Sequence, residues 1–112
     1  MIAWKNITSI EELETAIKTS FDKNVLIFKH STRCIISKTV LRNFEDDAAK
    51  DANEKIEFYF LDLLEHRNVS NEIANKLNVE HQSPQILLIS NGKCFFNASH
   101  EAIDFKGLQE KI

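Results

Sequence analysis

The chain has 112 residues, of which 43% are hydrophobic and 28% charged, and its formal net charge is −3. This length and composition predict one domain spanning residues 1–112, large enough for an ordinary core, and they argue against a disordered chain. The basic residues are scattered rather than clustered, so we expect no nucleic-acid partner.

The N-terminus lacks the charged-then-apolar pattern of a secretory signal, and no apolar run approaches the roughly 20 residues of a membrane span. We therefore expect a cytoplasmic protein without a membrane partner. The two cysteines, Cys34 and Cys94, are too far apart in the sequence to form a CxxC pair. The only glycines, Gly92 and Gly107, exclude a Walker A loop and a dinucleotide-binding GxGxxG motif. The four histidines share no metal-ligand spacing, so no metal site is expected.

The N-terminal third begins with alternating strand and helix patterns. A short strand is predicted around residues 4–7. A helix follows over 10–21, and Ser9 and Glu12 form an S-x-x-E capping box at its start. Residues 25–29 begin with four consecutive apolar residues, which indicates a central strand buried on both faces.

A long amphipathic helix is predicted from Cys34 to about Lys50, with Thr32 or Ser31 as its N-cap. Its predicted apolar stripe consists of Ile36, Val40, Leu41, Phe44 and Ala48. This order places a thiol between the end of a central strand and the first turn of a helix.

The second half of the chain continues with shorter segments. They are a strand over 56–61, a helix marked by Val69, Ile73 and Leu77 and ended by Asn78, strands over 86–89 and 93–97, and a closing helix around Phe105, Leu108 and Ile112 capped by Asp104 or Ser99. Asn91-Gly92 predicts a tight hairpin between the last two strands.

The order of these segments predicts an α/β fold with a central mixed sheet of four or five strands and helices on both faces. In such sheets, ligands bind beyond the carboxyl ends of the strands, where Cys34 falls.

Cys34 is the predicted nucleophile. Free backbone N–H groups and the helix dipole favour a thiolate at a helix N-terminus. Lys29, Arg33 and Lys38 would favour the anion further. Such a thiolate can attack a disulfide sulfur. The alternative is a buried, inert cysteine, because free cysteines are among the most buried residues.

Three further positions bear on this chemistry. Ser37 stands where a dithiol enzyme has its second cysteine; its hydroxyl could bond the Cys34 sulfur or simply lie on the polar face of the helix. Cys94 is either a resolving thiol or a small core or edge residue. Pro84 is the only proline, and a cis Ser83–Pro84 bond could lie against the thiol and expose the Ser83 backbone to a partner.

The run from Phe28 to Ser37, together with His-Gln-Ser-Pro-Gln at 81–85, resembles the monothiol bacilliredoxin family. These are proteins of Gram-positive bacteria that make bacillithiol, and the resemblance covers nearly the whole chain. It implies a thioredoxin-like fold, a nucleophile at Cys34 and a cis-proline at Pro84. It also implies that Cys34 removes bacillithiol from S-bacillithiolated proteins, with free bacillithiol as the co-substrate that regenerates the thiol and with no bound cofactor.

Bacillithiol carries a malate group, so Lys29 and Arg33 are candidate cationic contacts for it, although both could be solvated surface charges. Thr32, Ser37, Ser83 and Pro84 complete the expected substrate-binding residues.

The chain departs from the family pattern at Ile35, where the family has a proline that constrains the first helical turn. Two other functions stay open from the sequence. One is a general disulfide reductase in which Cys94 resolves Cys34. The other is a thioredoxin-like adaptor that binds a protein without turnover.

Overall fold

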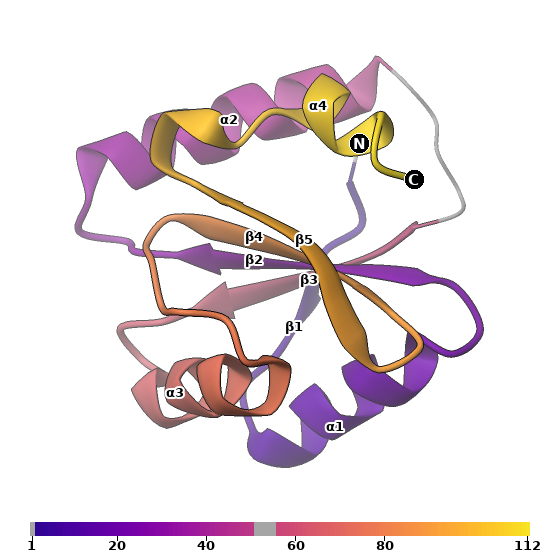
Figure 1. Cartoon of the computed structure of the whole chain (residues 1–112). Helices are drawn as coiled ribbons and strands as arrows, with labels where there is room; N and C mark the ends of the chain where they lie inside the picture. Colours follow the sequence, from indigo (N-terminus) through magenta and orange to yellow (C-terminus); the bar gives the residue numbers. More distant parts are fainter. Residues whose placement is uncertain (1, 51–55) are drawn as a thin grey trace.

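The computed structural model describes residues 2–50 and 56–112 (Figure 1). Within them, strands and α-helices alternate up to the last two strands, which follow one another directly. The elements are β1 (Lys5–Asn6), α1 (Ile10–Thr19), β2 (Asn24–His30), α2 (Ile35–Ala49), β3 (Ile56–Asp62), α3 (Arg67–Leu77), β4 (Gln85–Ser90), β5 (Lys93–Ser99), a short 3-10 helix η1 (His100–Ala102) and α4 (Phe105–Gln109).

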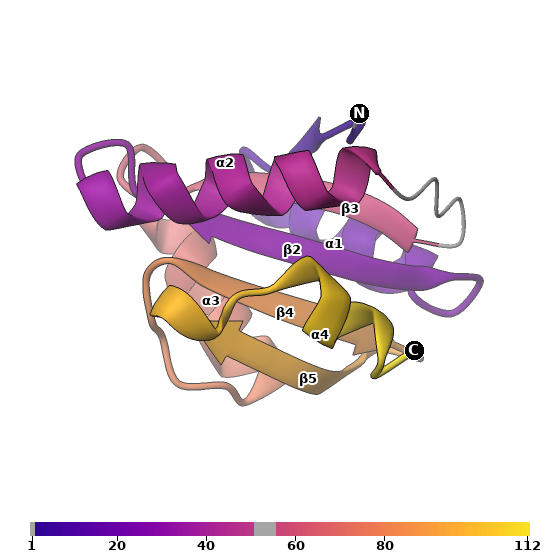
Figure 2. The same cartoon turned by 90° about the horizontal axis from the view of Figure 1, so that it is seen from above.

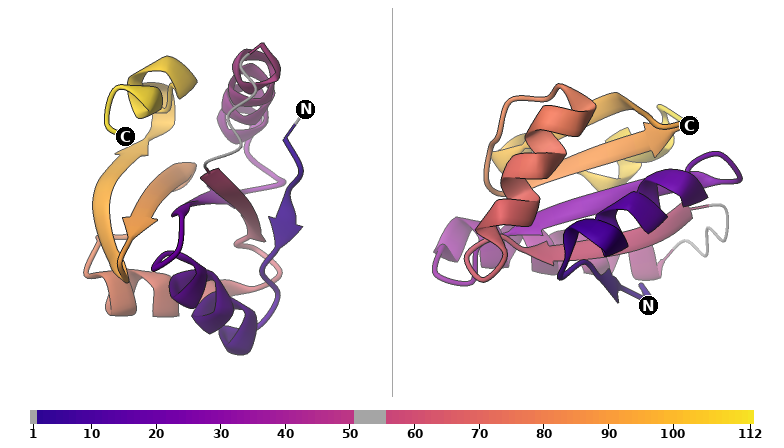
Figure 3. Two further views of the ribbon diagram at one scale, coloured as in Figure 1. Left: turned by 90° about the vertical axis from the view of Figure 1, so that its right-hand side faces the viewer. Right: turned by 90° about the horizontal axis from the view of Figure 1, so that it is seen from below.

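The strands form one five-stranded sheet in the order β1-β3-β2-β4-β5. Strands β1, β3 and β2 are parallel, whereas β4 and β5 run antiparallel to their neighbours. Helices α2 and α4 cover one face of the sheet, and α1 and α3 cover the other (Figures 1, 2 and 3). The predicted mixed α/β sheet with helices on both faces is therefore confirmed, with β2 at its centre.

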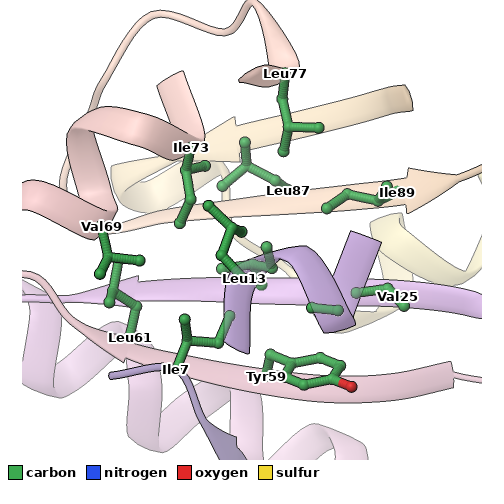
Figure 4. Packing of buried hydrophobic residues seen from close by; sticks show 12 residues of the cluster. Ile7, Leu13, Val25, Tyr59, Leu61, Val69, Ile73, Leu77, Leu87 and Ile89 are labelled. Carbon is green, nitrogen blue, oxygen red and sulfur yellow. The ribbon is translucent and has the colours of Figure 1, made fainter. Parts of the chain in front are cut away.

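Side chains of β2 alternate between two hydrophobic cores, because successive residues of a strand point to opposite faces. Val25 and Ile27 pack towards α1 and α3. Figure 4 shows the hydrophobic cluster on this face of the sheet. Leu26 and Phe28 pack towards α2 and α4. All four are fully buried, which contributes about 1.5–3 kcal/mol for each side chain. β2 is therefore buried between two helical layers.

Several predicted boundaries are confirmed. The Ser9 side chain accepts a hydrogen bond from the Glu12 N–H and caps α1. Asn78 ends α3 in the left-handed conformation with a φ of 54°. Asn91 and Gly92 both have positive φ, 52° and 77°, as the tight hairpin between β4 and β5 requires.

Other details of the helices differ from the prediction. The N-cap of α2 is Cys34 itself, not Thr32 or Ser31. Ile36, assigned to the apolar stripe, is 48% exposed, and Ser37 is fully buried in its place. The buried face of α2 is the one that contains Phe44 and Ala48, and Ser37 lies seven positions before Phe44, two helical turns away.

Two apolar residues predicted to belong to helices lie beyond them. Phe21 follows the end of α1 and is 62% exposed; its ring lies against Gly92 of the hairpin. Ile112 follows α4 and is 47% exposed. Asp104, one of the two predicted caps of the closing helix, accepts a hydrogen bond from the Gly107 N–H, whereas Ser99 precedes η1.

Candidate active site

Cys34 lies four residues beyond β2, at the point where the chain enters α2. It is partly exposed and has the extended backbone of an N-cap, with a φ of −100° and a ψ of 119°. Its carbonyl accepts from the Lys38 N–H at 3.1 Å, the first hydrogen bond of the helix. The N–H groups of the first helical turn therefore have no partner within α2 and face the end where the thiol lies. Helix N-termini with such free N–H groups are common anion-binding positions in proteins.

Ser37 and His30 form a polar network beneath the first turn of α2. The Ser37 hydroxyl lies 2.8 Å from Nδ1 of His30 and accepts a hydrogen bond from the Ser31 N–H at 3.1 Å. Burial is the largest influence on His30 and lowers the pKa of its imidazole, which favours the neutral ring. The hydroxyl then donates to Nδ1. Ser37 thus joins α2 to the end of β2. Because it is fully buried, the predicted substrate contact and the alternative position on the polar face of the helix are both wrong.

His30 is held in place by aromatic rings as well as by Ser37. Its ring centroid lies 5.4 Å from that of Phe60 and 6.4 Å from that of Phe28. The imidazole is 5% exposed. The turn that presents Cys34 is therefore attached to a rigid part of the sheet.

The Ser83–Pro84 peptide bond is cis, as predicted. Strand β4 begins at the next residue, Gln85, which lies opposite Lys29 near the carboxyl end of β2. The loop that contains Pro84 therefore reaches the same end of the sheet as the start of α2 (Figure 1). The Pro84 carbonyl accepts a hydrogen bond from the His100 N–H at 3.1 Å.

Lys29 was predicted to lie at the rim of the site and to favour the thiolate, and this prediction is wrong. The side chain is fully buried, because Lys29 alternates with His30 along β2 and points to the opposite face of the sheet. Its amine lies 3.2 Å from the Ser70 carbonyl oxygen and 3.3 Å from Nδ1 of His81. Burial lowers the pKa of Lys29 to about 8.

Cys94 cannot resolve Cys34 in this fold. Cys94 lies opposite Ile89, which in turn lies opposite Val25 near the start of β2. The distance along β2 from Val25 to His30 is about 16 Å at 3.3 Å per residue, and Cys34 lies beyond it. A disulfide requires Cα atoms within about 7 Å. Cys94 also packs against the core below α1 and α3, and burial raises the pKa of its thiol.

Thr32 and Arg33 are exposed between β2 and the thiol, and Ser83 is partly exposed beside Pro84. Ile35 is 79% exposed at the first position of α2. Among the described residues, no group of three or more His, Cys, Asp or Glu side chains is placed to hold a metal ion.

Sequence reasoning missed residues that the structure places around the site. They are His30, His81, Gln85 and His100, none of which was assigned a role there. His30 had a usable signal: it ends the strand that leads to Cys34, and it must point to the face opposite Lys29. His81 contacts Lys29, His100 bonds to Pro84, and Gln85 pairs with Lys29 across the sheet; no local pattern indicates these contacts.

A sequence model of the monothiol bacilliredoxin family matches residues 5–108 of the chain. The chain belongs to this family. The family and the fold are those of thiol–disulfide oxidoreductases.

Solved structures agree with this assignment. A chain assigned as an oxidoreductase with a thioredoxin fold is 30% identical, with a TM-score of 0.82, and the match covers 96% of this chain and 91% of that one. Thioredoxin of Malassezia sympodialis is 22% identical, with a TM-score of 0.76 and coverage of 99% and 89%. Mitochondrial thioredoxin 3 of Saccharomyces cerevisiae is 16% identical, with a TM-score of 0.75 and coverage of 98% and 93%. The last two show the fold alone. In the described part of the bacilliredoxin chain, no helix has both the length and the apolar character to span a membrane.

Proposed function

We propose that this bacilliredoxin removes bacillithiol from S-bacillithiolated cytoplasmic proteins, with Cys34 as its only catalytic thiol. The observation that carries this proposal is the position of Cys34: a partly exposed thiol at the N-cap of α2, at the same end of the sheet as the cis Ser83–Pro84 bond. Family membership supplies the substrate class.

The first step is an exchange of disulfides. The Cys34 thiolate attacks the bacillithiol sulfur of the protein mixed disulfide, a new S–S bond forms to Cys34, and the protein sulfur leaves as a thiolate. That thiolate takes its proton from water. Ser37 occupies the position of a second cysteine, but its hydroxyl cannot displace the mixed disulfide.

An external thiol must therefore regenerate the enzyme, and free bacillithiol is the simplest one. Its thiolate attacks the bacillithiol sulfur bound to Cys34, which gives bacillithiol disulfide and restores the Cys34 thiolate. Over the two steps, the free bacillithiol is oxidised and the protein sulfur is reduced, whereas the bacillithiol taken from the protein stays in a disulfide throughout.

The exposed side chains next to Cys34 are suited to the substrate. Arg33 can pair with the malate carboxylates of bacillithiol, because a guanidinium binds carboxylates in a planar, two-point arrangement. Thr32 can donate a further hydrogen bond, and the Ser83 backbone is the candidate contact for the protein side of the mixed disulfide. Lys29 has no such role, because it is buried on the opposite face.

Turnover of a bacillithiolated model protein tests this function. With free bacillithiol as the reductant, release of the protein thiol by the wild type should be at least about a thousandfold faster than by Cys34→Ser, because the variant lacks the nucleophile. The matched control, Cys94→Ser, should stay within about twofold of the wild type, since the two thiols do not meet.

Mass spectrometry of the oxidised wild type should find bacillithiol on Cys34. An internal Cys34–Cys94 disulfide, or equal turnover by Cys34→Ser, would contradict the mechanism. A protein that binds its partner but leaves the mixed disulfide intact would instead be an adaptor.

A further inference from the structure

The proposed mechanism leaves unused a group of buried polar side chains on the sheet face opposite α2. Lys29 of β2 is fully buried, and Gln85 of β4 and Ser70 of α3 are each 1% exposed. Lys29 and Gln85 lie directly opposite each other in the antiparallel pairing of β2 and β4. Side chains opposite each other in such a pair share one face of the sheet, so both point towards α3.

Both side chains bind the three residues that precede Ser83. The Gln85 amide donates from Nε2 to the Glu80 carbonyl oxygen at 3.0 Å and accepts at Oε1 from the Gln82 N–H at 3.4 Å. Between these two contacts, the Lys29 amine meets the His81 ring at 3.3 Å. The segment 80–82 is therefore attached, residue by residue, to the centre of the sheet.

The Lys29 amine also fixes this segment to α3. It donates to the Ser70 carbonyl oxygen, and the Ser70 hydroxyl lies 3.3 Å from the same His81 nitrogen. No carboxylate pairs with Lys29 in the described chain. An amine buried without an opposite charge costs stability, and an apolar side chain would fill the space at lower cost. The amine nevertheless forms the contacts with His81 and Ser70 that attach segment 80–82 to the sheet and to α3.

We propose that Lys29 and Gln85 are positioning residues that hold segment 80–84 so that Ser83 and Pro84 face Cys34, and that they thereby set the affinity for the protein part of the mixed disulfide. This inference rests on the proposed function for its substrate. It separates two tasks: the His30–Ser37 network positions the thiol, and the Lys29–Gln85 pair positions the surface that the substrate contacts.

The test compares Lys29→Met and Gln85→Leu with a control that loses an exposed lysine, Lys18→Met. For the bacillithiolated model protein, KM should rise about five- to tenfold in both test variants, as expected for the loss of one or two hydrogen bonds that hold the binding surface. The value of kcat should stay within about twofold, because the first turn of α2 is untouched. Alkylation of Cys34 by iodoacetamide should not change, since this small reagent does not need segment 80–84.

Unchanged KM in both variants would overturn the proposal, and so would a parallel fall in kcat and alkylation rate, which indicates general loss of structure. Amide hydrogen exchange gives a readout that does not depend on turnover. Exchange at residues 79–83 should be faster in Lys29→Met and Gln85→Leu than in Lys18→Met, with the α2 amides unaffected. If the wild type does not turn over the substrate, the proposed function fails, and the exchange data still decide whether Lys29 and Gln85 hold the segment.

Discussion

The two polar networks at the end of β2 differ in chemistry and in reach. His30 and Ser37, on the α2 side, join an imidazole to a hydroxyl seven residues away. Lys29, on the α3 side, contacts Ser70 and His81, which are 41 and 52 residues away. One network fixes a turn next to it in the sequence; the other brings distant segments together.

The comparison shows how one strand can position both halves of a site. Lys29 and His30 are consecutive, so they point to opposite faces of the sheet. The backbone between them links the Cys34 turn to the loop that contains Pro84. The two networks also differ in cost, because a hydroxyl–imidazole pair can stay neutral, whereas an ammonium group is expensive to bury.

The largest expected effect concerns the charge of Lys29. Its pKa in the folded protein is about 8, below the ordinary 10.5. Between these pH values the unfolded chain binds a proton that the folded chain does not, so the free energy of unfolding rises with pH. At about 1.4 kcal/mol per pH unit, the rise amounts to about 3 kcal/mol. It should be absent in Lys29→Met when urea unfolding is measured from pH 7.5 to 10.5.

Subtracting the variant's curve from that of the wild type removes the contribution of every other group that titrates in this range. Lys18→Met should retain the full slope, because Lys18 is exposed. If wild type and Lys29→Met showed the same slope, the Lys29 amine of the wild type would have to be charged and solvated. The contrast between the two networks would then be lost.

Removal of the Ser37 hydroxyl should have the next largest effect. In Ser37→Ala the Ser31 N–H loses its acceptor and His30 loses its partner, which should lower the free energy of unfolding by about 1–2 kcal/mol. Unlike Lys29→Met, this variant should also change the rate at which iodoacetamide alkylates Cys34, because the turn below the thiol is released.

Thr39→Ala is the matched control for Ser37→Ala, since Thr39 is exposed on the same helix. Its stability should stay within about 0.5 kcal/mol of the wild type. If Ser37→Ala behaved in the same way in both measurements, the hydroxyl would not hold the turn.

The fold could be predicted because its signals are local. Four consecutive apolar residues identify β2, the Ser9 capping box starts α1, and Asn91-Gly92 makes the hairpin. The errors occur where packing overrides local pattern. Ile36 has the hydrophobicity of a core residue, but the helical face that Phe44 fixes leaves it exposed and buries Ser37.

The parts of the site also differ in how far the sequence could predict them. The places of Cys34 and the cis-proline followed from short motifs. The burial of Lys29 was predictable in principle, because β2 is covered on both faces, yet its charge led to the interpretation as a rim residue. The contacts of Lys29 with His81 and Ser70, and its pairing with Gln85, depend on the strand register and on how α3 packs, neither of which is visible in a local pattern.

The smallest expected effect tests the departure from the family pattern at Ile35. Cys34 already has a φ of −100° and a ψ of 119°, the conformation that a residue before proline adopts. Ile35 is the first residue of α2, where a missing N–H breaks no hydrogen bond within the helix. Ile35→Pro should therefore stabilise the fold by about 0.4–1 kcal/mol through the unfolded state. Ile35→Ala controls for the loss of the exposed side chain.

The same substitution should act in the opposite direction on the thiol. Proline removes one of the free N–H groups at the N-terminus of α2, where Cys34 is the N-cap, so alkylation by iodoacetamide near neutral pH should be slower in Ile35→Pro than in Ile35→Ala. If Ile35→Pro is more stable but its thiol is alkylated more slowly, the isoleucine of the wild type gives a less rigid turn with one more hydrogen-bond donor. Destabilisation by Ile35→Pro would instead mean that the isoleucine N–H has a structural partner, and the thiol would then owe its reactivity to the remaining amides of the first turn.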